Sequence, residues 1–195
     1  MRLNLPNTLT LLRIIMIPVL GLAFLLPPSL AHVLAAAIFG LAGITDWLDG
    51  FLARRLKQTS AFGAFLDPVA DKLIVAVALV ALLTFNNTPY FAVPVAVIIG
   101  REIAVSALRE WMASLGRRAS VAVNMMGKIK TTAQMAAILI LLYGRDVAGL
   151  PLQKIGLWLL YVAAILTLYS AILYLRAAWD TIRQEPAQPE QNMGG

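Results

Sequence analysis

Long apolar stretches separated by short polar breaks run through the whole chain. Six of them approach the ~20 residues that a helix needs to cross a bilayer. They lack the apolar/polar alternation of barrel strands, so helices are favoured. We therefore predict an all-α integral membrane protein with six transmembrane helices. The predicted spans are Leu5–Leu26, Leu30–Leu48, Leu66–Phe85, Tyr90–Trp111, Val121–Tyr143 and Ile155–Tyr174.

Polar side chains are expected to gather at one end of this bundle. Odd-numbered spans begin, and even-numbered spans end, with charged or hydroxyl residues. Helices that run alternately up and down place all of these ends on one side of the membrane. Of the 16 Lys and Arg residues, only Arg145 and Lys154 fall on the other side. Because positive residues are retained in the cytoplasm, we predict that the polar side and both termini are cytoplasmic.

Composition narrows the class of protein further. The 195 residues are 60% hydrophobic and 13% charged, which fits one membrane domain over residues 1–183. The Pro-, Gln- and Glu-rich segment 184–195 is predicted to be a disordered tail. The absence of cysteine excludes thiolate nucleophiles and thiolate metal sites. The net charge of +6 is interpreted as topology and contact with anionic lipid, not as nucleic-acid binding.

Four aspartates at the end of the second span and the start of the third carry the candidate chemistry. Asp46 and Asp49 are three positions apart and Asp67 and Asp71 four apart, so each pair shares one face of its helix. A lone aspartate at a helix end is usually topogenic or solvated. A group of carboxylates beside hydrocarbon is costly and points to a functional site. Four such charges need a cation between them, because like charges repel.

The neighbours of these carboxylates indicate the kind of cation and ligand. Gly50 and Ala53 continue the first helical face and Gly63 the second, and small side chains let a bulky ligand approach. Arg54 adds a guanidinium of the kind that pairs with phosphate. Oxygen ligands without cysteine point to a hard divalent ion such as Mg²⁺, Mn²⁺ or Ca²⁺. We predict a site at which two ions bind a diphosphate.

The spacing of these residues resembles the signature of a known family. The pattern D-x2-D-G-x2-A-R-x8-G-x3-D-x3-D is typical of the CDP-alcohol phosphatidyltransferases, and the chain matches all eight fixed positions between Asp46 and Asp71. The resemblance implies the fold of that family. It also implies transfer of a phosphatidyl group from CDP-diacylglycerol, or of a related group from a CDP-alcohol, to a hydroxyl with release of CMP.

The resemblance also implies separate roles for the signature residues. The four aspartates would coordinate two ions, Mg²⁺ or Mn²⁺, and Asp71 would also be the base that deprotonates the acceptor. An aspartate suffices because the acceptor hydroxyl meets the metal field, which makes its proton easier to remove. Arg13 is expected near the mouth of the nucleotide site. The residues expected at the CDP site are Gly50, Ala53, Arg54, Gly63 and Thr10.

The acceptor has to be inferred from the fourth and fifth spans. Arg101 lies deeper in its span than topology requires, and converging cations suit a small dianionic phosphate. These segments look like the bacterial branch of the family that makes phosphatidylglycerophosphate. That likeness implies sn-glycerol 3-phosphate as acceptor and the bacterial inner membrane as location. The candidate phosphate ligands are Arg101, Arg109, Lys128 and Lys130, although the two lysines are equally well explained as interfacial anchors.

Two alternatives stay open. Within the family, the acceptor is inositol phosphate, serine or phosphatidylglycerol instead. In another class, a cation transporter also carries intramembrane carboxylates. A transporter is expected to have polar residues throughout the membrane depth, whereas the far halves of these spans are nearly featureless. The resemblance further implies a homodimer.

Overall fold

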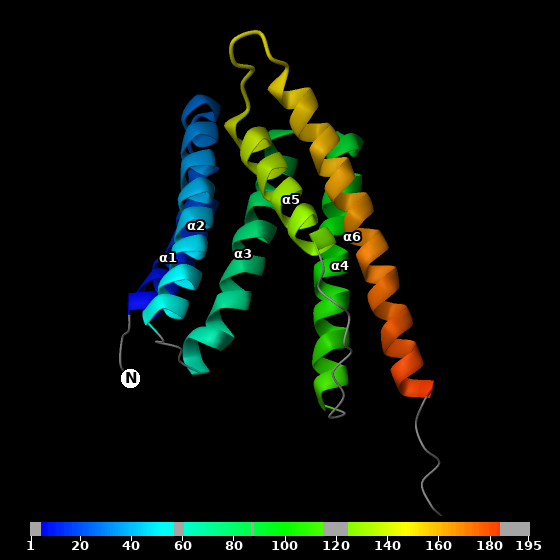
Figure 1. Cartoon of the computed structure of the whole chain (residues 1–195). Helices are drawn as coiled ribbons and strands as arrows, with labels where there is room; N and C mark the ends of the chain where they lie inside the picture. The colour runs from blue at the N-terminus through cyan, green and yellow to red at the C-terminus, as the bar shows by residue number, and fades with distance from the viewer. Residues whose placement is uncertain (1–4, 57–60, 87, 115–124, 184–195) are drawn as a thin grey trace, which may run out of the picture.

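The computed structural model of the chain describes residues 5–56, 61–86, 88–114 and 125–183. Within these ranges six helices run alternately up and down (Figure 1). They are α1 (Leu5–Ala23), α2 (Pro28–Leu56), α3 (Ala61–Phe85), α4 (Pro89–Ser114), α5 (Met125–Tyr143) and α6 (Leu152–Arg183). The predicted all-α bundle is confirmed for the described residues. The predicted tail, residues 184–195, lies outside them.

Four of these helices are long and apolar enough to cross a membrane, so the chain is a multi-pass membrane protein. The four candidate spans are Pro28–Leu52, Phe65–Phe85, Pro89–Ser114 and Leu152–Trp179. The apolar parts of α1 and α5 are shorter, Asn7–Ala23 and Ile129–Tyr143. The prediction of six spans is therefore supported for four helices.

Proline and glycine set several helix ends. Pro28 and Pro89 are the first residues of α2 and α4, where a missing N–H costs no helical hydrogen bond. Directly after α5, Gly144 has a φ of 71°, in the left-handed region that favours glycine. A Cβ atom at this position would clash with the imidazole ring of His32, so the turn also requires the missing side chain.

α2 and α3 extend beyond the apolar stretches that predicted them. α2 continues past Leu48 to Leu56, and α3 begins at Ala61, before the predicted start at Leu66. Pro68 lies inside α3, between Asp67 and Asp71. The whole aspartate signature, apart from its linker, is therefore helical.

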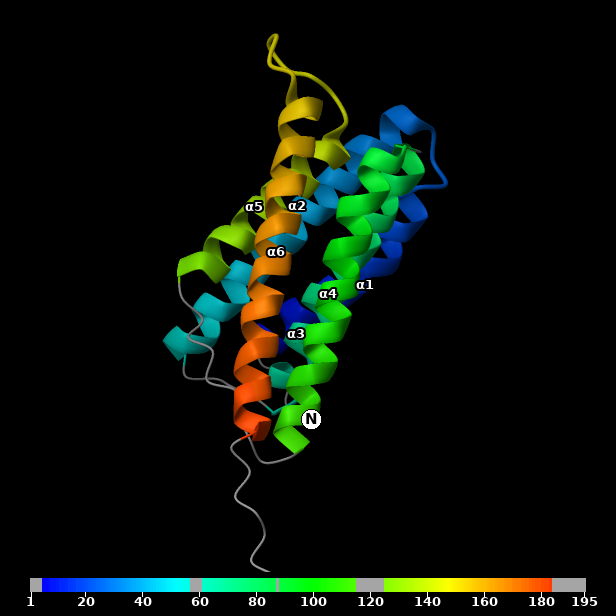
Figure 2. The ribbon, with the colours of Figure 1, turned by 90° about the vertical axis from the view of Figure 1, so that its right-hand side faces the viewer.

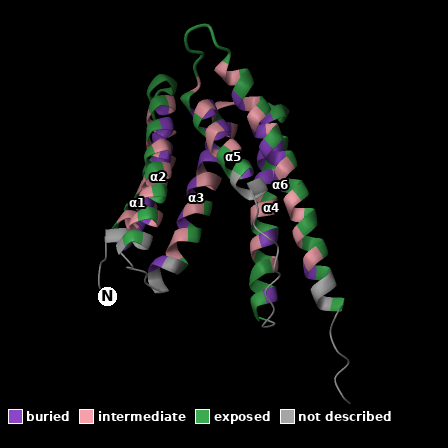
Figure 3. Cartoon of the chain, in the orientation of Figure 1, coloured by how far each residue is buried: buried purple, intermediate pink, exposed green. Residues whose placement is uncertain are grey.

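The buried core occupies the upper half of the bundle (Figure 3). Its fully buried side chains include Leu82 of α3, Ile98 of α4, Ile138 of α5 and Leu160 of α6. Below this core α3 and α4 diverge in Figure 1, whereas α1 stays packed against α2 and α3. On the other side α4 and α6 run side by side (Figure 2).

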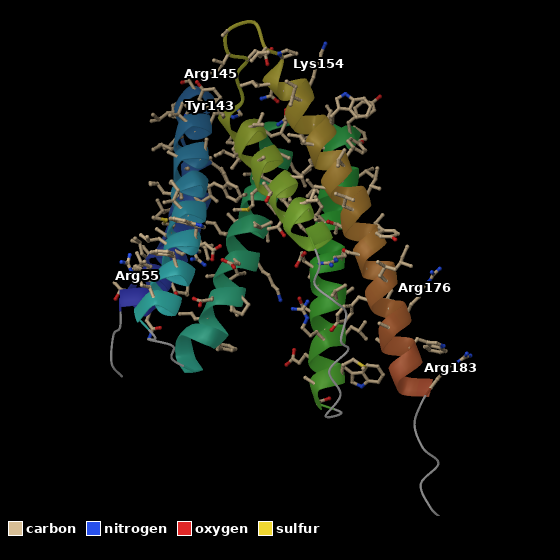
Figure 4. All side chains as sticks on the ribbon, viewed as in Figure 1. Arg55, Tyr143, Arg145, Lys154, Arg176 and Arg183 are labelled. Carbon is tan, nitrogen blue, oxygen red and sulfur yellow. The ribbon has the colours of Figure 1, made fainter. Side chains whose placement is uncertain are left out.

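The charged residues labelled in Figure 4 follow the predicted asymmetry between the two ends. Arg145 and Lys154 lie at the upper end, beside the turn between α5 and α6. Arg55, Arg176 and Arg183 lie toward the lower end, where α2 and α6 finish. α3 and α4 therefore diverge at the end that carries the labelled arginines of α2 and α6.

Candidate active site

The aspartates of the signature lie near the lower ends of two neighbouring helices. Asp46 and Asp49 belong to the last turns of α2, and Asp67 and Asp71 to the first turns of α3. The Asp49 side chain is only 6% exposed, whereas those of Asp46 and Asp71 are 49% and 47% exposed. The group therefore combines one buried carboxylate with others that a ligand can reach.

Arg13 of α1 lies between the two pairs and is fully buried. Its Nη1 atom lies 3.1 Å from Asp46 Oδ1 and donates to Asp71 Oδ1 at 2.5 Å. Its Nη2 atom donates to Asp49 Oδ2 at 2.5 Å. A single guanidinium thus joins three carboxylates from α2 and α3. The sequence placed Arg13 only near the nucleotide mouth.

Thr10 brings the fourth aspartate into contact with α1. It lies three positions before Arg13 and therefore on the same helical face. The Thr10 hydroxyl is buried and donates to Asp67 Oδ1 at 2.5 Å. One face of α1 thus contacts all four carboxylates. Thr10 was expected at the nucleotide, and the structure places it on an aspartate predicted to bind metal.

The carboxylates suit a hard divalent ion, although a guanidinium lies at their centre. Within the described ranges, no three Asp, Glu or His side chains are grouped to hold a metal ion. Arg13 is instead the charge on which Asp46, Asp49 and Asp71 converge, and its Nε atom is buried without a hydrogen-bond partner. Carboxylate oxygens are the ligands that Mg²⁺ prefers. The chemistry of the donors therefore suits such ions, but Arg13 occupies the point on which three of the carboxylates converge.

The other signature residues lie on the same two helices. Gly50 follows Asp49 in α2 and is half-buried, and Gly63 is buried in α3. Ala53 and Arg54 belong to α2, but their side chains fall outside the described part of the structure. The CDP-lining role of these residues stays a prediction.

A cavity of about 610 Å³ opens beside Asp71 between α3, α4 and α5. Toward the core it is lined by apolar side chains such as Leu79 and Ile98. Its polar residues are Asp71, Lys72, Glu102, Ser106, Lys130, Thr131 and Gln134. A mainly apolar cavity with a few converging polar groups is typical of a ligand site.

The structure separates the predicted phosphate ligands. Lys130 is buried and lines this cavity, with its Nζ atom 3.4 Å from Glu102 Oε1. Arg101 donates to Glu102 Oε1 at 2.8 Å and to Ser170 Oγ of α6 at 2.9 Å. Arg101 lines a different groove, between α4 and α6. Lys130 therefore lines the cavity beside Asp71, whereas Arg101 is hydrogen-bonded to Ser170 of α6.

Arg109, a third candidate, does not line the cavity in the described structure. Arg109 is exposed, and its guanidinium carbon lies 5.7 Å from the centre of the Tyr174 ring on α6. Lys128 belongs to α5, but its side chain lies outside the described residues. Of the four predicted ligands, the described structure brings only Lys130 next to Asp71.

Lys72 and Glu102 were not predicted as site residues, yet both line the cavity. The Lys72 Nζ atom donates to Ser106 Oγ at 2.6 Å and so links α3 to α4 across the opening. Glu102 accepts from both Arg101 and Lys130. The available signal was a charge next to Asp71 and another within the fourth span. Whether the side chains of Lys72 and Glu102 face the cavity depends on how the helices pack, and the spacing of residues along the chain does not reveal this packing.

A second groove, of about 460 Å³, reaches Asp46 between α2 and α5. It is lined mainly by apolar or small residues, including Phe39, Gly40 and Met135, and Thr131 also borders it. Two mainly apolar spaces therefore lead along the membrane helices to the aspartates, one on each side of α5.

Comparisons with known proteins identify the family of the chain. Residues 3–169 match the family described as CDP-alcohol phosphatidyltransferase. A protein of Sodalis glossinidius named CDP-diacylglycerol–glycerol-3-phosphate 3-phosphatidyltransferase is 55% identical over 91% of this chain and 96% of its own length. Proteins with the same name from Pectobacterium atrosepticum and Salmonella choleraesuis are 53% and 51% identical, each over 91% of this chain and 96% of their own.

Proposed function

The chain belongs to the CDP-alcohol phosphatidyltransferase family, and from this premise we propose that it transfers a phosphatidyl group from CDP-diacylglycerol to sn-glycerol 3-phosphate. The products are phosphatidylglycerophosphate and CMP, and the process served is phospholipid synthesis. The names of the similar proteins support this pair of substrates. The observation that carries the proposal is the approach of all four aspartates to one face of α1, beside a cavity that contains buried Lys130.

Asp46, Asp49, Asp67 and Asp71 are the residues that would hold the divalent ions on which this family generally depends. Mg²⁺ or Mn²⁺ fits their oxygen donors, and two ions suit four carboxylates. Such ions, when bound, neutralise the diphosphate of the donor and make CMP a better leaving group. Gly50, Ala53 and Arg54 of α2 and Gly63 of α3 would line the cytidine side.

The two apolar spaces suit the acyl chains of the lipid donor. Both run along membrane helices and end at an aspartate, Asp71 in one and Asp46 in the other. CDP-diacylglycerol can therefore keep its chains in the membrane while its diphosphate lies at the carboxylates. Entry from the side, within one leaflet, avoids moving the headgroup through hydrocarbon.

Asp71 is the proposed base. Its side chain is about half exposed and lines the larger cavity, so an acceptor hydroxyl can approach it. The carboxylate takes the proton of the glycerol 1-hydroxyl, and this oxygen attacks the phosphatidyl phosphorus. The bond from that phosphorus to the oxygen of the CMP phosphate breaks, and CMP leaves with the electron pair. No covalent enzyme intermediate is required.

Lys130 and Lys72 are the proposed ligands of the acceptor phosphate. Both line the cavity that contains Asp71. Glu102 accepts from the Lys130 ammonium and Ser106 from that of Lys72, so both cations are held at the cavity wall. A phosphate in this space would lie between two positive charges, with its glycerol directed to Asp71. Arg101, Arg109 and Lys128 remain candidates for longer-range attraction.

The proposed location is the bacterial inner membrane, with the aspartates on the cytoplasmic side. The arginines of α2 and α6 near the lower end agree with the positive-inside rule. CMP and glycerol 3-phosphate are charged and water-soluble, which also places this end in the cytosol. Assembly as a homodimer is proposed from the family resemblance. Membership of the family leaves no support for a cation transporter.

The choice of acceptor is tested with purified protein, CDP-diacylglycerol, Mn²⁺ and one radiolabelled acceptor at a time. Glycerol 3-phosphate should yield a new labelled lipid, distinct from the acceptor added, whereas inositol phosphate, serine and phosphatidylglycerol should not. Lipid product from one of these three, with none from glycerol 3-phosphate, would refute the proposed acceptor but keep the reaction class. Absence of CMP release with every acceptor would refute the transferase itself.

A further inference from the structure

Arg13 is a buried cation in the place where the carboxylates would bind divalent ions. It is 0% exposed and contacts Asp46, Asp49 and Asp71 at 3.1, 2.5 and 2.5 Å. Building on the proposed function, we propose that Arg13 is the internal counter-ion of the ion-free site. It competes with the divalent ions for the same carboxylate oxygens and is displaced when they bind.

The competition follows from the atoms involved. Mg²⁺ binds carboxylate oxygens at about 2.1 Å in near-octahedral geometry and needs an open path to them. Oδ1 of Asp46 and Asp71 and Oδ2 of Asp49 already accept contacts from the guanidinium. An ion and a guanidinium cannot both occupy the point on which these three oxygens converge, because two cations at that range repel. An ion that binds at this point therefore requires Arg13 to leave it.

The charges of the group explain why an ion would win this competition. The group has four carboxylates and one guanidinium, which contacts three of them, while Asp67 accepts a hydrogen bond from the neutral Thr10 hydroxyl. The ion-free group therefore keeps an excess of negative charge close to hydrocarbon, which is costly. Arg13 reduces this cost without removing it. Divalent ions bring more positive charge to the same oxygens.

Arg13 is also incompletely bonded in its present position. Its Nε atom is buried and has no hydrogen-bond partner in the described structure. A buried donor without a partner is destabilising. The missing hydrogen bond at Nε lowers the cost of moving the Arg13 side chain. Once displaced, its planar, permanently charged guanidinium can pair with a phosphate of the lipid donor. The three helices that Arg13 joins would be held together by the ions instead.

Direct measurement of Mn²⁺ binding tests the competition without measuring activity. The protein is purified in detergent, treated with EDTA and titrated with Mn²⁺, and free Mn²⁺ is followed by electron paramagnetic resonance. Arg13→Gln removes the competing cation, so its Mn²⁺ dissociation constant should fall at least tenfold. Arg13→Lys keeps a charge that cannot span three carboxylates and should give an intermediate value. Arg55→Gln removes an exposed arginine of α2 and should change the constant less than twofold.

Thermal unfolding of the same proteins provides a second readout. Arg13→Gln should lower the melting temperature clearly in EDTA and much less in saturating Mn²⁺, because the ions replace the counter-ion. Equal losses in both buffers, or Mn²⁺ binding by Arg13→Gln that is unchanged or weaker, would overturn the inference. If Arg13→Gln does not fold, the Mn²⁺ constant of Arg13→Lys decides. Failure of the wild-type protein to bind Mn²⁺ would refute the proposed ion site itself.

Discussion

Lys130 brings a buried positive charge into the cavity that contains Asp71, and its ammonium contacts the carboxylate of Glu102 there. Replacing it by glutamine should remove one charge-assisted contact with the acceptor phosphate. Such a contact is worth about 1.5–3 kcal/mol, so the KM for glycerol 3-phosphate should rise by about 10- to 100-fold. The KM for CDP-diacylglycerol should change little. Steady-state kinetics on the purified variant measures both constants.

Arg109→Gln is the matched control for Lys130→Gln. Arg109 is also a predicted phosphate ligand, but it is exposed and lies over the Tyr174 ring. Its loss should therefore raise the KM for glycerol 3-phosphate by much less. Equal effects of the two variants would contradict the assignment of Lys130 to the acceptor.

The spacing of the aspartates was enough to predict the site, but not the contacts that shape it. Asp46, Asp49, Asp67 and Asp71 follow from helical periodicity and a signature. The ion pairs of Arg13 join residues 36 and 58 positions apart, and they depend on how α1 packs against α2 and α3. Nor does the depth of Arg101 in its span reveal that its partner Ser170 lies on α6.

At the scale of elements, Gly144 links two helices: it begins the turn after α5 and packs against α2. Gly144 has a left-handed backbone and packs directly on His32 of α2. Gly144→Ala adds both the cost of that backbone, about 1–2 kcal/mol, and a clash with the imidazole. The melting temperature in detergent should fall more than it does for Gly149→Ala. Gly149 has a φ of 79°, and no atom lies within 4 Å of the position that a Cβ would take there, so it isolates the backbone cost.

If the two glycine variants lose equal stability, the packing of Gly144 on His32 contributes nothing. Neither variant should alter the KM for either substrate, because the turn lies at the end of the bundle opposite the aspartates. Steady-state kinetics, measured below the melting temperatures of both variants, checks that the turn affects stability and not substrate binding.

The apolar runs predicted the helices and some of their ends, such as Phe85 of α3 and Tyr143 of α5, but not the polar ends of α2 and α6. Breaks at Pro28 and Pro89 placed the starts of α2 and α4 within a few residues, because proline cannot continue a preceding helix. The end of α2 at Leu56 and of α6 at Arg183 lie well beyond the apolar stretches. Polar residues continue those helices outside the hydrocarbon, and hydropathy alone does not detect such extensions.

For the whole molecule, the orientation in the membrane is the property on which substrate access depends. The chain contains no cysteine, so single cysteines can be introduced without background. Val147→Cys reports on the exposed turn between α5 and α6, and Arg183→Cys on the end of α6. In intact spheroplasts an impermeant maleimide should label Val147→Cys alone, and Arg183→Cys only after permeabilisation. The reverse pattern would place the aspartates outside the cell.

Phosphatidyl transfer at the aspartates is tested most directly by Mn²⁺-dependent release of CMP from CDP-diacylglycerol and glycerol 3-phosphate. The wild-type protein should release CMP only with the ion and both substrates. Asp71→Asn should slow release by at least about a hundredfold, since a general base contributes about 10²–10⁴ to the rate. Asp146→Asn, at the opposite end of the bundle, should retain wild-type activity. Release by folded Asp71→Asn within tenfold of the wild-type rate would contradict the role of Asp71 as base.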